Sequence, residues 1–204
     1  MAAVGLLGGT FNPPHVAHLV CAMEARDQLA LDVVRLVPAG MPPHKQLPDD
    51  PGVEVRVALC ALAAASEPGL EVLRAEADRP GPSYTVDTLR ALHDAFPGDE
   101  LTFIVGGDQA LSLPTWREPE GLLSLARIAV AARGDATRDE ILDRSSALAG
   151  AAERLVFFDM PRLDVSSSDV RRRVAGGRPI RHLVPAAVSD RIAADGLYRE
   201  RVQA

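Results

Sequence analysis

Two histidines that follow a glycine pair are the residues of this sequence best suited to phosphate chemistry. Gly8 and Gly9 end a short apolar run, and two prolines then lead to His15 and His18, which are three positions apart. On a helix that starts near Pro14, both imidazoles lie on one face, beside the first-turn amides and the positive end of the helix dipole. Because glycine lets the backbone approach a ligand closely, we expect this turn to bind a phosphate chain.

A second candidate anion site lies near the carboxyl end, in VSSSDVRRR at residues 165–173. Serines and an aspartate in this order favour the start of a helix, with Arg171 one turn further along. The simpler interpretation is a capped helix with an exposed basic face. We favour a second phosphate site, in which the hydroxyls of Ser167 and Ser168 join the Arg171 guanidinium, because that group grips phosphate oxygens bidentately.

Two further features have both a structural and a functional interpretation. Gly106 and Asp108 follow a strongly apolar run, at the position where open α/β sheets bind ligands, but a simple turn with a capping aspartate explains them equally well. Trp116, the only tryptophan, fits either a core residue or a platform that stacks on a ring.

The elements that must position these residues alternate along the chain. Apolar runs predict strands and the segments between them have helical patterns, so we expect a Rossmann-like, doubly wound parallel sheet. The strands are predicted over 3–7, 33–37, 70–73, 101–105, 127–132 and 155–158. The helices are predicted over 14–31, 53–66, 84–96, 137–148 and 184–198, with one more that starts at about residue 166. No repeat or linker divides the chain, so we expect one domain over residues 1–204, with a small helical extension from about residue 165.

Composition narrows the function. A net charge of −6 argues against nucleic-acid or membrane partners, which usually select a basic face. The two cysteines, Cys21 and Cys60, lack metal-site spacing, so we expect buried thiols in a reducing cytoplasm.

The sequence contains no GxxxxGK[ST], GxGxxG, GxSxG or HExxH motif, so P-loop hydrolysis, hydride transfer, serine hydrolysis and zinc-dependent proteolysis lose support. Whether the chain forms a homo-oligomer stays open.

The motifs together resemble a known family. GGTFNPPHVAHL at 8–19 is similar to the HxGH signature of the nucleotidyltransferase superfamily, and VSSSDVR at 165–171 is similar to its ISSTxxR motif. The PPHK, SYTVDTL, GGD and tryptophan segments between them resemble those of bacterial nicotinate mononucleotide adenylyltransferases. Ala17 stands where that family usually has glycine, and Ser168 where it usually has threonine.

This resemblance implies transfer of AMP from ATP to nicotinate mononucleotide, with Mg²⁺ carried by ATP and no dedicated metal site on the protein. It assigns the triphosphate to His15, His18, Arg171, Ser167 and Ser168. It places the nucleotide against Gly8, Gly9, Thr10 and Phe11, and the adenosine beside Gly106 and Asp108. The acceptor falls to Thr85 and Trp116 around the pyridine ring, with Lys45 on the substrate phosphate.

Other functions stay open at this point. A sister adenylyltransferase acting on nicotinamide mononucleotide or phosphopantetheine would use the same first motif, and a non-catalytic nucleotide sensor would keep the fold. A metal hydrolase built on His15, His18 and Asp108 has the least support, because no third ligand lies at a recognisable spacing.

Overall fold

Six parallel strands form one sheet in the order β3-β2-β1-β4-β5-β6. The structure is a computed structural model that describes residues 1–42, 49–132 and 136–199. Each neighbouring pair of strands is parallel, which confirms the predicted doubly wound sheet. The strands are β1 (Ala3–Gly9), β2 (Val33–Pro38), β3 (Leu70–Val72), β4 (Glu100–Gly106), β5 (Arg127–Ala132) and β6 (Leu155–Asp159).

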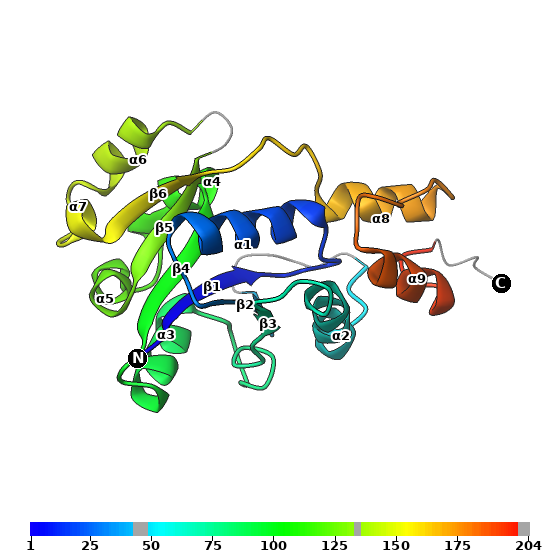
Figure 1. Cartoon of the computed structure of the whole chain (residues 1–204), viewed down its shortest axis with the longest axis horizontal. Coiled ribbons are helices and arrows are strands. Elements are labelled where there is room, and N and C mark those ends of the chain that lie inside the picture. The colour runs from blue at the N-terminus through cyan, green and yellow to red at the C-terminus, as the bar shows by residue number, and fades with distance from the viewer. Residues whose placement is uncertain (43–48, 133–135, 200–204) are drawn as a thin grey trace.

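Helices cover both faces of this sheet (Figure 1). One face packs against α1 (Val16–Gln28) and α2 (Val53–Ala64). The other face packs against α3 (Thr85–Ala95), α4 (Gly107–Leu111), α5 (Pro119–Leu125), α6 (Arg138–Ser145) and α7 (Ala151–Arg154). A short 3₁₀ turn, Leu113–Thr115, precedes Trp116. Since both faces are covered, the central strands read as continuous apolar runs rather than as alternating ones.

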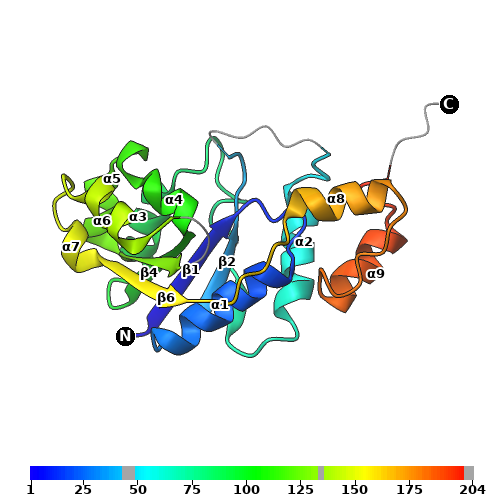
Figure 2. The same cartoon turned by 90° about the horizontal axis from the view of Figure 1, so that it is seen from above.

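Two more helices, α8 (Ser167–Ala175) and α9 (Ala186–Ala194), lie at the end of the molecule away from α5, α6 and α7 (Figures 1 and 2). They share an apolar cluster with the outer side of α2, in which Leu59 contributes from α2, Val170 from α8 and Val188 from α9. This cluster fixes the amino end of α8, and therefore the serine motif, relative to the sheet.

The strand order creates a crevice beside β1. The chain runs outward from β1 to β2 and β3, and then returns to place β4 on the other side of β1. Loops that leave β1 and β4 therefore run to opposite faces, and in doubly wound sheets ligands bind at the carboxyl ends of two such strands. The glycine end of β1 and the junction of β4 with α4 at residues 106–108 both line this crevice.

Several element boundaries differ from the predicted ones. Helix α1 begins at Val16 rather than near Pro14, because His15 is an extended N-cap residue with φ −139° and ψ 169°. It ends at Gln28, and Leu31 packs as a buried residue of the following turn. The short helices α4 and α7 were not predicted, since five and four residues are too few to show a helical period.

The expectation of buried thiols holds for one of the two cysteines. Neither cysteine is in a disulfide, but only Cys60 is fully buried; Cys21 is half-buried, because it lies in a cavity wall. Among the residues that the structure describes, no helix is long and apolar enough to cross a bilayer.

Candidate active site

Two glycines end β1, and an unusual phenylalanine lies in the turn that follows them. A Cβ atom on Gly8 would lie 2.8 Å from the Phe103 ring, and one on Gly9 would lie 3.1 Å from the Phe11 ring. Phe11 itself has a φ of 50°, in the left-handed region that residues other than glycine seldom adopt, and its side chain is 1% exposed. Such backbone strain is concentrated at functional sites, where the surrounding packing maintains it.

The two histidines lie against each other, as their spacing predicted. Their rings stack with centroids 3.7 Å apart, and the edge of the Phe11 ring meets His18 at 4.9 Å. The His15 amide donates to Nδ1 of His18 at 3.1 Å. Because Nδ1 of His18 accepts a hydrogen bond, the neutral ring carries its proton on Nε2 and can donate from that atom.

A cavity of about 840 Å³ brings most of the predicted phosphate and nucleotide residues together. The amino end of α8 reaches it because the Ser167 hydroxyl donates to the Pro13 carbonyl at 2.8 Å, and the Ser166 hydroxyl caps the helix by accepting from the Asp169 amide. Ala17, which replaces the usual glycine, is also part of the wall. The predicted residues that line this cavity are Gly8, Gly9, Thr10, Phe11, His15, His18, Gly106, Asp108, Ser167 and Ser168.

Arg171 bonds to a serine of the larger cavity, although it does not line that cavity itself. Its guanidinium donates to the Asn12 carbonyl at 2.8 Å and to the Ser168 hydroxyl at 3.3 Å, so it ties α8 to the turn after β1. The residues that line the larger cavity include Arg172 and Arg162, but not Arg171. The assignment of Arg171 to the triphosphate therefore stays a prediction, and Arg172 and Arg162 are candidates that the sequence patterns did not single out.

A second cavity, of about 340 Å³, adjoins the first. Thr85, the first residue of α3, and Trp116 both line it, as the resemblance implied. The indole N–H of Trp116 donates to the Ser112 hydroxyl at 3.0 Å, and its ring meets Phe103 edge-on at 6.1 Å. Gly8, Gly9 and Thr10 line both cavities, so the two spaces meet at the turn after β1.

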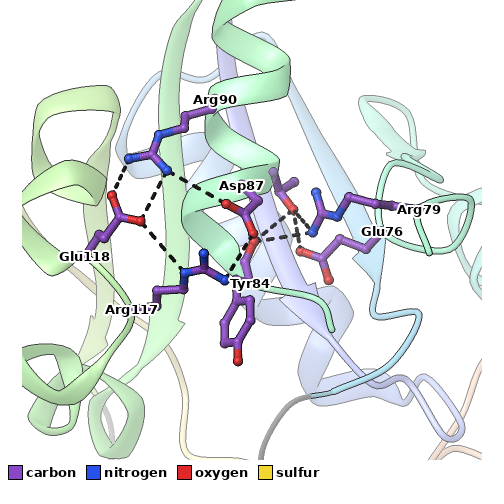
Figure 3. Close-up of polar contacts among 8 residues, drawn as sticks. Glu76, Arg79, Tyr84, Asp87, Arg90, Arg117 and Glu118 are labelled. Atoms are coloured by element: carbon purple, nitrogen blue, oxygen red, sulfur yellow. Dashed lines mark hydrogen bonds and ion pairs between the residues drawn. The ribbon is translucent and has the colours of Figure 1, made fainter. Parts of the chain in front are cut away.

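Charged side chains join α3 to the segment after Trp116 (Figure 3). Arg117 lies over the Tyr84 ring at 4.6 Å, with carboxylate oxygens of Asp87 and Glu118 each 3.8 Å away. Arg90 forms a closer ion pair with Glu118. These side chains are 34–51% exposed, so their contribution to stability is small, but they join the two sides of the smaller cavity.

Glu76 is a buried carboxyl in the wall of the smaller cavity, which the sequence patterns did not reveal. It is 6% exposed and accepts a hydrogen bond from the Thr88 hydroxyl at 2.9 Å (Figure 3). Burial raises the pKa of this carboxyl above its ordinary value, and hydrogen bonds from Thr88 and Ser83 and the charge of Arg79 offset only part of that effect.

Replacing Glu76 with glutamine tests whether burial raises the pKa of this carboxyl. A carboxyl whose pKa is raised by folding stabilises the protein while it is protonated, and that stability is lost as the pH rises through the folded-state pKa. Glu76→Gln removes the charge but keeps an acceptor for Thr88, so we expect its Tm to exceed the wild-type Tm at neutral pH and to match it below about pH 4. Thermal unfolding at several pH values measures this difference; a constant difference at every pH would contradict the description.

Lys45, predicted to bind the substrate phosphate, lies outside the described residues. The smaller cavity is also lined by Gln109 and Arg117. Each directly follows a predicted site residue, Asp108 and Trp116 respectively, so its position in the sequence is a signal for it. By contrast, Glu76 lies in a segment whose pattern looks purely structural.

Comparisons with known proteins identify the family. A family model described as "Cytidylyltransferase-like" matches residues 6–173. The chain is 46% identical over 198 residues to a "Probable nicotinate-nucleotide adenylyltransferase" of Roseiflexus, covering 97% of this chain and 98% of the relative. It is 42% identical over 196 residues to a protein of the same name from Thermus thermophilus, covering 96% and 99%.

Solved structures show the same fold. The Plasmodium falciparum nicotinic acid mononucleotide adenylyltransferase complexed with NaAD superposes with a TM-score of 0.79 at 18% identity, over 97% of this chain and 98% of that one. A second complex of the same protein, with APC, gives a TM-score of 0.78 at 16% identity, over 97% and 98%. With both the family model and the curated relatives spanning most of its length, this chain belongs to the cytidylyltransferase-like family and, within it, to the nicotinate-nucleotide adenylyltransferases.

Proposed function

We propose that this chain transfers the adenylyl group of ATP to the 5′-phosphate of nicotinate mononucleotide, giving nicotinate adenine dinucleotide and pyrophosphate in NAD biosynthesis. The observation that carries the proposal is the meeting of two cavities at Gly8, Gly9 and Thr10. The larger one, with its histidines and serines, suits ATP, and the smaller one, with Trp116 and Thr85, suits a pyridine nucleotide. Curated relatives carry the corresponding name, and the Plasmodium protein was solved with the dinucleotide NaAD.

The chemistry needs positioning more than acid–base help. The acceptor phosphate is already ionised at neutral pH, so it attacks the α-phosphorus of ATP as it stands and pyrophosphate leaves from the opposite side. The residues must align the two substrates and stabilise the charge that develops on the leaving group. His18 would donate from Nε2 to a phosphate oxygen, and the amino ends of α1 and α8 would add their dipoles.

Several parts of this proposal go beyond the family assignment. Mg²⁺ would enter as part of the substrate, with most of its ligands supplied by the phosphates, since this ion prefers substrate oxygens and water to an all-protein cage. Among the described residues, no group of three or more His, Cys, Asp and Glu side chains could hold a metal. Action in the cytoplasm and any self-association are also proposals.

A substrate panel tests the function directly. We expect pyrophosphate release from ATP and Mg²⁺ with nicotinate mononucleotide, and much slower release with nicotinamide mononucleotide or phosphopantetheine. Formation of the dinucleotide, followed by chromatography, confirms that the adenylyl group reaches the acceptor. ATP binding without release in any arm would support a sensor, and faster release with another acceptor would reassign the substrate.

A further inference from the structure

We propose that Arg56, a buried residue of α2, is a positioning residue that holds the Thr10 peptide in the alignment needed for transfer between the two cavities. The proposal rests on the proposed function, because it concerns the geometry of that reaction. Arg56 lines neither cavity and would not touch a substrate.

Arg56 is completely buried, and three of its four hydrogen bonds go to backbone carbonyls. Its exposed fraction is 0%, which is unusual for a charged side chain. Nη1 donates to the Thr10 carbonyl at 2.9 Å and to the Ala39 carbonyl at 2.6 Å, and Nη2 donates to the Gly40 carbonyl at 3.2 Å. Nε donates to the Asp50 carboxylate at 3.0 Å, which also balances the buried charge.

These bonds converge on the segment that the two cavities share. Thr10 lines both cavities, and Ala39 lines the smaller one. The Ala39 amide donates to the Gly9 carbonyl at 2.9 Å, so the ends of β1 and β2 are bonded both to each other and to Arg56. One planar guanidinium therefore fixes the distance between the turn after β1 and the segment that leaves β2.

The segment after β2 is in turn attached to the acceptor side. The Ser83 hydroxyl accepts from the Gly40 and Met41 amides at 3.0 and 3.3 Å. A Cβ atom on Gly40 would lie 2.3 Å from the Glu76 carbonyl, so this contact leaves no room for a side chain. Arg56 thus connects Thr10, through Gly40, to the loop that precedes Thr85.

A positioning role predicts a specific kinetic effect. Misalignment of reacting groups lowers the rate of the chemical step without removing any contact with substrate. We expect Arg56→Met to lower kcat roughly 30-fold or more, with the KM of each substrate changed less than about threefold. Arg56→Lys should recover only part of the rate, because an ammonium group lacks the planar fork that reaches several carbonyls at once.

A matched variant separates positioning from stability. Leu31 is 4% exposed and lies in the turn between α1 and β2, at the end of the sheet opposite the glycine turn. Leu31→Ala should lower the Tm by creating a cavity, but should leave kcat near the wild-type value. In Arg56→Ala, millimolar guanidinium ion should raise kcat, whereas the same concentration should leave wild type and Leu31→Ala unchanged.

Two outcomes would overturn the proposal. If folded Arg56→Met keeps the wild-type kcat and loses only Tm, as Leu31→Ala does, Arg56 is merely structural. If the KM for ATP rises in Arg56→Met while kcat stays at the wild-type value, Arg56 contributes its charge to ATP binding and does not align the reacting groups. Hydrogen exchange of the segment 8–12 gives a readout independent of activity: faster exchange in Arg56→Met than in Leu31→Ala supports positioning, and equal exchange contradicts it. If the wild type is inactive but segment 8–12 still exchanges faster in Arg56→Met than in Leu31→Ala, the proposed reaction is wrong and the positioning role of Arg56 stands.

Discussion

Replacing His18 with alanine is expected to lower kcat at least about tenfold, because the enzyme loses a donor aimed at the charge that develops on the leaving pyrophosphate. The imidazole is held for this purpose: its ring stacks on His15, and its Nδ1 accepts the His15 amide hydrogen bond at 3.1 Å. That bond leaves Nε2 as the donor nitrogen of the neutral ring. The measurement is steady-state pyrophosphate release at saturating substrate.

The same change should also cost some stability, since the His18 side chain caps the first turn of α1. Loss of a cap bond lowers the free energy of unfolding by about 1 kcal/mol, which is too little to unfold the chain. His18→Asn is the matched control, because its amide can accept from His15 and still offer a donor. We expect asparagine to restore the Tm and part of the rate. A near-normal kcat in the alanine variant would remove His18 from the mechanism.

Replacing Arg171 with alanine should lower kcat/KM for ATP by roughly 100-fold, if this guanidinium serves the triphosphate as the motif implies. The structure makes the test informative, because Arg171 bonds to the Asn12 carbonyl and the Ser168 hydroxyl, whereas Arg172 lines the larger cavity. Its loss would remove a cation from the phosphate side and also release α8 from the turn after β1. The KM for nicotinate mononucleotide should change little.

Arg172→Ala is the comparison variant for that experiment, because Arg172 lines the larger cavity whereas Arg171 does not. The Arg172 side chain is 73% exposed and pairs with Asp169 on its own helix, so we expect its removal to lower kcat/KM for ATP less than the removal of Arg171 does. Arg171→Lys keeps the charge without the bidentate fork and should fall between alanine and wild type. A larger loss in Arg172→Ala than in Arg171→Ala would assign the phosphate contact to Arg172 instead.

Local patterns in the sequence predicted the elements well where a run was long and uniform. The strand predicted over 127–132 is β5, Arg127–Ala132, because a strand buried on both faces must be apolar throughout. Predictions failed at ends and in short elements. The start of α1 depends on the extended backbone of His15, and α7 has four residues, so neither leaves a periodic signal.

The sequence likewise predicted part of the candidate site and missed the rest. Glycines, histidines, serines and a tryptophan at family spacings were predicted from the sequence and lie at the two cavities, because close approach to a ligand restricts both residue type and spacing. The sequence could not show that Arg171 turns to the Asn12 carbonyl, since that partner is a backbone atom 159 positions away. The sequence also could not show whether Asp108 only caps a turn or lines a cavity, and the structure places it in the wall of the larger cavity.

The sequence by itself determined the alternation of strands and helices and the residue types of the phosphate turn, since both depend on neighbours along the chain. The tertiary structure alone decided the strand order, which puts β4 beside β1 and opens the crevice between them. It also decided the burial of Arg56, whose partners are mainly carbonyl groups of Thr10, Ala39 and Gly40. Every residue type carries such a carbonyl, so a contact with it leaves no trace in the sequence until folding brings the chain together.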